Sequence, residues 1–116
     1  TLLYRLVFNL VENAIRYSRP GSTVNVSICD NNSRVFLRVE DQGPGIPKQY
    51  RESIFQPFFR LDKSRSRAYG GAGLGLALVW EIAALHGGAV EVEASSENGT
   101  TMLASLPKRS AALTEQ

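Results

Sequence analysis

The sequence is poor in several residue types, and each scarcity narrows the class of protein. Cys29 is its only cysteine, so no disulfide can form within the chain. The formal net charge is only +2, from 13 basic and 11 acidic side chains, which is too small to indicate a nucleic-acid-binding protein. No apolar run approaches the roughly 20 residues that a membrane-spanning helix requires. The composition therefore argues against a disulfide scaffold and against nucleic acid as a partner.

Apolar residues make up 43% of the 116 residues, which is enough to build the core of one folded domain. Apolar residues at three- and four-residue spacing predict a helix over residues 3–15 and a second helix from Gly75 to Gly87. A short helix is also possible over residues 48–55. Alternating apolar residues predict two antiparallel hairpins, with strands at 24–28 and 35–39, and at 89–95 and 100–106. This pattern is typical of an α+β two-layer sandwich.

The polar side of the first predicted helix carries two asparagines. Asn9 and Asn13 are four residues apart and Arg16 follows three later, so the three side chains form one stripe. Taken alone, the stripe is most simply a solvated helix face. Asparagine competes with the backbone for hydrogen bonds, however, which makes two of them in one stripe unusual. The functional interpretation is a pair of amide oxygens offered to a hard cation such as Mg2+, with Arg16 near a phosphate.

A turn-forming segment, Asp41-Gln42-Gly43-Pro44-Gly45-Ile46, follows the second predicted strand. Its glycines let the backbone turn sharply and let a flat ligand approach closely. Asp41, at the strand end, is placed to accept a hydrogen bond from an exocyclic amine. An ordinary Asp-Gly turn without a ligand remains open as an alternative.

A glycine-rich segment, Gly70-Gly71-Ala72-Gly73-Leu74-Gly75, opens the second predicted helix. Consecutive backbone N–H groups in such a loop can bind an anion, assisted by the positive end of the helix, although a flexible hinge fits equally well. The glycine spacing does not match a dinucleotide fingerprint, because the sixth position counted from Gly71 is Leu76. No glycine in the chain precedes a lysine, which also excludes a P-loop.

An aromatic cluster precedes a basic, polar stretch over residues 60–71. The aromatic residues, Phe55, Phe58 and Phe59, are most simply a hydrophobic anchor for a loop. The cations of the stretch form either a solvated charge run or a cover for a polyphosphate.

In this order and spacing, the segments resemble the N, G1, F and G2 boxes of the sensor histidine kinase ATP-binding domain. That domain belongs to the GHKL superfamily, which also contains DNA gyrase and mismatch-repair ATPases. The resemblance extends from Leu2 to Pro107. The four matching motifs are Asn9-Leu10-Val11-Glu12-Asn13-Ala14, Asp41-x-Gly43-x-Gly45, Phe55-x-Pro57-Phe58 and Gly71-x-Gly73-Leu74-Gly75-Leu76.

The resemblance implies a Bergerat-type fold that binds ATP and Mg2+, and it gives individual residues roles. Asn9 and Asn13 would hold Mg2+ and, with Arg60, act in catalysis. Asp41 would accept the adenine amine hydrogen, and residues 47–72 would form a lid over the nucleotide. The other nucleotide-binding residues implied are Arg16, Tyr17, Gly43, Gly45, Ile46, Gly71, Gly73, Leu74, Gly75 and Leu76, with Thr100 reaching the adenine through water.

One position separates kinases from ATPases within the superfamily. Gyrase-like members carry a glutamate, the base that activates water, four residues before the Mg2+-binding asparagine. Here that position is Asn9, and an amide cannot take a proton. Glu12 points roughly 60° away around the helix. The resemblance therefore implies a kinase that keeps ATP for another acceptor, with a GHKL-type ATPase and a non-catalytic nucleotide-binding or docking module as alternatives.

In such kinases the acceptor is a histidine on a separate helical dimerisation domain, and a response regulator acts downstream. His86 lacks the His-Glu/Asp-x-x-x-Pro setting of that acceptor, so we expect the chain to bind ATP without phosphorylating itself. The resemblance also implies a position on the cytoplasmic side of a bacterial inner membrane for the full-length protein, with the present chain soluble.

The family domain normally has a strand and a helix before the N box. The resemblance thus implies an N-terminally truncated domain over residues 1–107, followed by a polar tail over residues 108–116. A sheet that lacks its edge strand would expose unpaired backbone groups, and we expect instability or pairing with a second copy through this edge.

Overall fold

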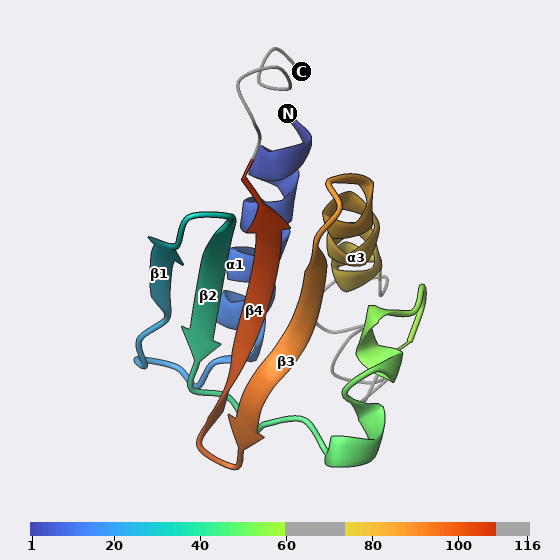
Figure 1. Cartoon of the computed structure of the whole chain (residues 1–116). Helices are drawn as coiled ribbons and strands as arrows, with labels where there is room; N and C mark the ends of the chain where they lie inside the picture. Colours follow the sequence, from blue (N-terminus) through green and yellow to red (C-terminus); the bar gives the residue numbers. More distant parts are fainter. Residues whose placement is uncertain (60–73, 109–116) are drawn as a thin grey trace.

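Two helices lie against one face of a four-stranded antiparallel sheet (Figure 1). The computed structural model describes residues 1–59 and 74–108. The strand order is β1-β2-β4-β3, with both neighbours of β4 antiparallel to it. The elements are α1 (Leu2–Tyr17), β1 (Asn25–Asp30), β2 (Arg34–Asp41), α3 (Gly75–Leu85), β3 (Ala89–Ser96) and β4 (Gly99–Pro107). The predicted α+β two-layer fold is confirmed.

Local sequence signals begin and end the two helices. The Thr1 hydroxyl caps α1 by accepting a hydrogen bond from the Tyr4 N–H at 3.3 Å. Gly87 ends α3 because it adopts φ 75°, which lets the Gly88 N–H reach the Ala83 carbonyl at 2.8 Å. Within the described ranges, no helix has the length and apolar character to cross a membrane.

The core lies between the helices and the sheet. Helical spacing brings Leu6, Leu10 and Ala14 of α1 onto one face, where all three are buried. The sheet contributes side chains from its alternate positions, and the fully buried ones include Val39 of β2. This packing fixes α1 over the middle of the sheet with its asparagine stripe free of the core.

Some predicted details differ from the structure. Residues 48–55 form two 3-10 turns, Lys48–Tyr50 and Ser53–Phe55, instead of one short helix. The apolar spacing of the second predicted helix also predicts that Leu85 faces the core, but it is 74% exposed because it is the last residue of α3. Ile15 of α1 is 62% exposed because it lies on a flank of the helix beside the buried face. Spacing alone did not reveal how far the buried stripe extends.

The edge strand β1 has an uncovered apolar face. Val26 and Ile28 pair with the buried residues Val39 and Leu37 of β2, so they lie on the face of the sheet against which the helices pack. Both are nevertheless exposed, Ile28 by 69%, because neither described helix extends over β1 (Figure 1). Pairing with a second copy through this edge stays a prediction.

Candidate functional site

The asparagine stripe of α1 faces the start of α3. The amide nitrogen of Asn9 donates a hydrogen bond to the Arg5 carbonyl one turn earlier, at 2.8 Å. The same amide therefore turns its oxygen outward, and a Cβ at Gly75 would stand 3.3 Å from that oxygen. Asn13 lies one turn further along α1 and is half-buried. The fold thus brings the Asn9 amide next to the N-terminus of α3, with Asn13 one helical turn away on the same stripe.

The first turn of α3 supplies backbone donors to the same place. Leu74 precedes the helix and makes no side-chain capping hydrogen bond. The first N–H groups of a helix have no partner within the helix, so those of Gly75 and Leu76 are available to an anion. Asn9 of the predicted amide pair therefore lies beside the glycine-rich helix start. The predicted residues Arg60, Gly71 and Gly73, and residues 60–72 of the predicted lid, lie outside the described residues.

Asp41 is a buried carboxylate at the end of β2. Only 6% of the residue is exposed. Its Oδ1 accepts hydrogen bonds from the N–H groups of Gly43, at 2.9 Å, and Thr100, at 3.2 Å. Burial raises the pKa of this carboxyl above its ordinary value, and the two N–H groups partly oppose that shift. Among the residues that the structure describes, no donor is bound to Oδ2, so this oxygen keeps the capacity to accept a hydrogen bond.

The glycines after Asp41 are required by close backbone contacts. A Cβ at Gly43 would lie 2.3 Å from the Tyr17 carbonyl oxygen, and one at Gly45 would lie 2.1 Å from the Ser96 carbonyl oxygen. Gly45 also has φ 87°, which disfavours any side chain. Two neighbouring elements thus determine the path of this loop, and Ile46 follows it half-buried.

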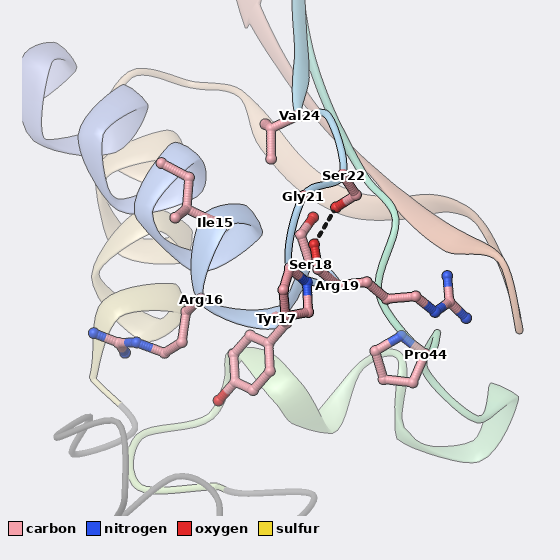
Figure 2. Close-up of a pocket in the computed structure, with 10 residues that line it drawn as sticks. Ile15, Arg16, Tyr17, Ser18, Arg19, Gly21, Ser22, Val24 and Pro44 are labelled. Atoms are coloured by element: carbon pink, nitrogen blue, oxygen red, sulfur yellow. Dashed lines mark hydrogen bonds between the residues drawn. The ribbon is translucent and has the colours of Figure 1, made fainter.

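Arg16 and Tyr17 end α1 and line a cavity of about 680 Å³ (Figure 2). The two side chains point in different directions from the helix end. The cavity is formed mainly by residues 15–24, and Pro44 closes it on the loop side. It contains neither Asp41 nor the asparagines, so it adjoins the predicted site without coinciding with it.

Two arginines that the sequence did not single out tie the Asp41 loop to the β3–β4 hairpin. The guanidinium of Arg19 donates to the carbonyl oxygens of Gln42, at 2.9 Å, and Glu97, at 2.7 Å. Arg51 donates to the carbonyl oxygens of Ile46, at 3.3 Å, and Ser95, at 3.2 Å. Each arginine joins segments far apart in the chain, so no local sequence signal could have identified it.

Substitution of Gly45 tests whether the close approach sets the loop, and Gly21 provides a matched control. Both glycines have positive φ, but a Cβ at Gly21 would meet nothing within 4 Å. We expect Gly21→Ala to cost about 1–2 kcal/mol of unfolding free energy from backbone strain alone. Gly45→Ala should cost at least ~2 kcal/mol more, because the Ser96 backbone must move. Equal urea-denaturation midpoints for the two variants would contradict this account.

Asp41→Asn tests the energetic effect of burying the carboxylate. An asparagine keeps an oxygen for the Gly43 and Thr100 N–H groups but carries no charge. Because burial raises the pKa of Asp41, the charged form opposes folding; the penalty is absent below the unfolded-state pKa and develops as pH rises through the folded-state pKa. The variant should therefore be more stable than the parent at pH 7, and the two should converge below about pH 3. A less stable variant at pH 7, measured by urea denaturation, would refute this.

Comparison with known proteins identifies the family. The model of the histidine kinase-, DNA gyrase B- and HSP90-like ATPases matches residues 1–110. The sensor-like histidine kinase SenX3 of Mycolicibacterium smegmatis is 43% identical over 107 residues, which is 92% of this chain and 28% of that protein. The sensor protein RstB of Escherichia coli is 47% identical over 106 residues, 91% of this chain and 24% of that protein.

Solved structures agree in fold. The mycobacterial sensor histidine kinase MprB superposes with a TM-score of 0.80 at 38% identity, covering 93% of this chain and 71% of that one. The catalytic domain of the histidine kinase ThkA gives 0.78 at 31% identity, covering 92% and 67%. The chain spans only about a quarter of the curated relatives named above. The chain therefore belongs to the HATPase_c family, as a catalytic ATP-binding domain of the sensor histidine kinase type.

Proposed function

We propose that this chain binds Mg-ATP in the space between the Asp41 loop and the start of α3, and presents the γ-phosphoryl group to a histidine of another domain. The observation that carries the proposal is the buried Asp41 carboxylate. Its Oδ1 accepts hydrogen bonds from two backbone N–H groups, and none of the described residues donates to Oδ2. An acceptor fixed in this way fits the exocyclic amine of adenine and repels the carbonyl oxygen that guanine has there.

The donor set near α3 fits a magnesium ion that is bound mainly through phosphates. Mg2+ prefers oxygen ligands and usually keeps few protein ligands when it binds a nucleotide. The Asn9 amide nitrogen is engaged by Arg5, so its oxygen is oriented toward the helix start, and Asn13 offers a second amide on the same stripe. Among residues 1–59 and 74–108 there is no cluster of acidic, histidine or cysteine ligands, so the amides are the relevant donors. Mg2+ bound there would supply neutralisation of phosphate charge.

Phosphate binding is assigned to backbone and cation together. The first N–H groups of α3, which have no partner within the helix, favour an anion, and the helix dipole adds to the attraction. Arg16 lies on the same stripe as the asparagines, and we assign it a phosphate contact. Tyr17, at the end of α1, is assigned to the base. We also assign phosphate contacts to Arg60, Gly71 and Gly73, on the basis of the sequence motifs alone.

The same geometry favours transfer over hydrolysis. Phosphoryl transfer depends mostly on positioning and charge stabilisation, so the attacking group decides the outcome. Asn9 occupies the position that a water-activating glutamate would need, and Glu12 is exposed on another side of α1. With no base beside the amide pair among the residues that the structure describes, we expect bound ATP to persist until an external nucleophile arrives.

The acceptor and the downstream partner are proposed from the relatives. SenX3, MprB and ThkA are named as histidine kinases, and we infer a helical dimerisation domain that carries the acceptor histidine, followed by a response regulator. His86 of this chain follows α3 with its ring Nδ1 2.8 Å from the Ile82 carbonyl oxygen. A ring held against its own helix suits a helix-end role better than the role of acceptor.

Binding is tested with Mg-ATP and two neighbouring variants of α1. Asn13→Ala should weaken Mg-dependent ATP binding about 10-fold, which is 1.4 kcal/mol, because one amide oxygen is lost. Glu12→Ala changes the adjacent, exposed side chain and should stay within about twofold of the parent. Isothermal titration with and without Mg2+ measures both. Equal loss in the two variants, or an effect that persists without Mg2+, would contradict the metal assignment.

Labelled ATP tests the separation of acceptor and ATP site. The chain incubated alone with γ-labelled ATP should stay unlabelled, because the proposed acceptor histidine is elsewhere. Addition of a helical histidine domain from a sensor kinase should give label on that domain only. Acid-labile label on the isolated chain would disprove the proposal that the acceptor lies on another domain.

A further inference from the structure

A β-bulge in β3 determines the direction of the Ser95 side chain. The register pairs Val92 with Met102 and Ser95 with Thr100, so three residue steps on β3 oppose two on β4. Strict alternation from Val92 would turn Ser95 to the open face of the sheet. The extra residue reverses this and brings Ser95 to the helix-covered face. Bulges of this kind commonly redirect a side chain next to a functional site.

The redirected serine completes a row of polar side chains across three strands. Asp41 of β2 pairs with Thr100 of β4, and Thr100 pairs with Ser95 of β3. The Ser95 and Thr100 hydroxyl oxygens are 2.8 Å apart. The Thr100 N–H donates to Oδ1 of Asp41, so Thr100 joins Ser95, through its hydroxyl, to the carboxylate, through its backbone N–H. Asp41 and Thr100 are buried, and Ser95 is half-buried.

Ser95 also fastens the far end of the Asp41 loop. Its Oγ accepts a hydrogen bond from the Ile46 N–H at 2.8 Å. Since Oγ is the acceptor there, the single hydroxyl proton of Ser95 remains available for Thr100. A Cβ at Gly45 would stand 3.3 Å from the same Oγ, so the loop passes directly over this side chain. One hydroxyl therefore contacts both the loop end and the row that leads to Asp41.

We propose that Ser95 is a positioning residue for the nucleotide base, which sets the Asp41 loop at the distance that adenine recognition requires. The inference rests on the proposed ATP site and adds a residue that touches no ligand. Without the hydroxyl, the half-buried Ile46 N–H loses its partner and Thr100 loses its neighbour. The loop then shifts relative to Asp41, and selectivity for the adenine amine falls.

The experiment compares ATP and GTP binding in four proteins by isothermal titration and competition. Ser95→Ala should bind ATP about 10-fold more weakly than the parent, with GTP affinity changed by less than about twofold, because only adenine uses the Asp41 contact. Ser95→Thr keeps a hydroxyl and should restore ATP affinity to within about threefold. Ser96→Ala is the matched control, since among the described residues the Ser96 hydroxyl is bonded to the Asn98 N–H in the exposed turn and not to the Asp41 loop. It should leave both affinities unchanged.

Three results would overturn the inference. The first is a Ser95→Ala variant that retains the parent's preference for ATP, the second is one that loses ATP and GTP affinity in the same proportion, and the third is a Ser95→Thr variant that binds ATP as weakly as Ser95→Ala. The second would show a general structural role. Failure of the underlying function is distinguishable, because the unaltered chain itself would then bind ATP and GTP equally. If Ser95→Ala does not fold, the threonine variant decides the question through its ATP-to-GTP ratio.

Discussion

The burial of one carboxylate, Asp41, constrains most of what surrounds it. A charged oxygen away from water must be hydrogen-bonded, and here two backbone N–H groups, from Gly43 and Thr100, satisfy Oδ1. That requirement fixes the turn after β2 and the register of β2 against β4 at the same time. The cost of burial is visible in the raised pKa of the carboxyl. A fold that retains such a group gains a preformed acceptor with a fixed direction.

The rest of the site follows from the way this loop is held. Arg19 and Arg51 fasten it to the β3–β4 hairpin, and close contacts at Gly43 and Gly45 leave it no alternative path. On the other side, the core packing of α1 places Asn9 beside the start of α3. Base recognition and phosphate binding are thus supported by different parts of the fold. The proposed ligand has an amine at one end and a polyphosphate at the other. The firmly held Asp41 loop suits the amine, and the asparagines of α1 with the start of α3 suit the polyphosphate.

The sequence was sufficient for those features that depend on local spacing. The helix and hairpin pattern predicted the α+β fold. We expect the glycines around Pro44 to admit a flat ligand, which stays a prediction; the structure shows that Gly43 and Gly45 also admit the carbonyl oxygens of Tyr17 and Ser96. Features that depend on pairing between distant segments could not be predicted. The bulge in β3 reverses the direction of the Ser95 side chain, and no residue type in the sequence of the strand indicates that a bulge is present. The exposure of Ile15 and Ile28 likewise depends on which elements cover the apolar face on which each residue lies. The spacing of apolar residues along the chain does not indicate this.

The central claim is that Asp41 recognises the base of ATP, and a crystal structure of the chain with Mg-ATP tests it most directly. The account predicts the adenine amine within about 3 Å of Oδ2 of Asp41, with the Gly43 and Thr100 N–H groups still bound to Oδ1. It also predicts the phosphates beside Asn9 and the first turn of α3. Adenine seated instead in the cavity formed by residues 15–24, with Asp41 making no contact to it, would contradict the account.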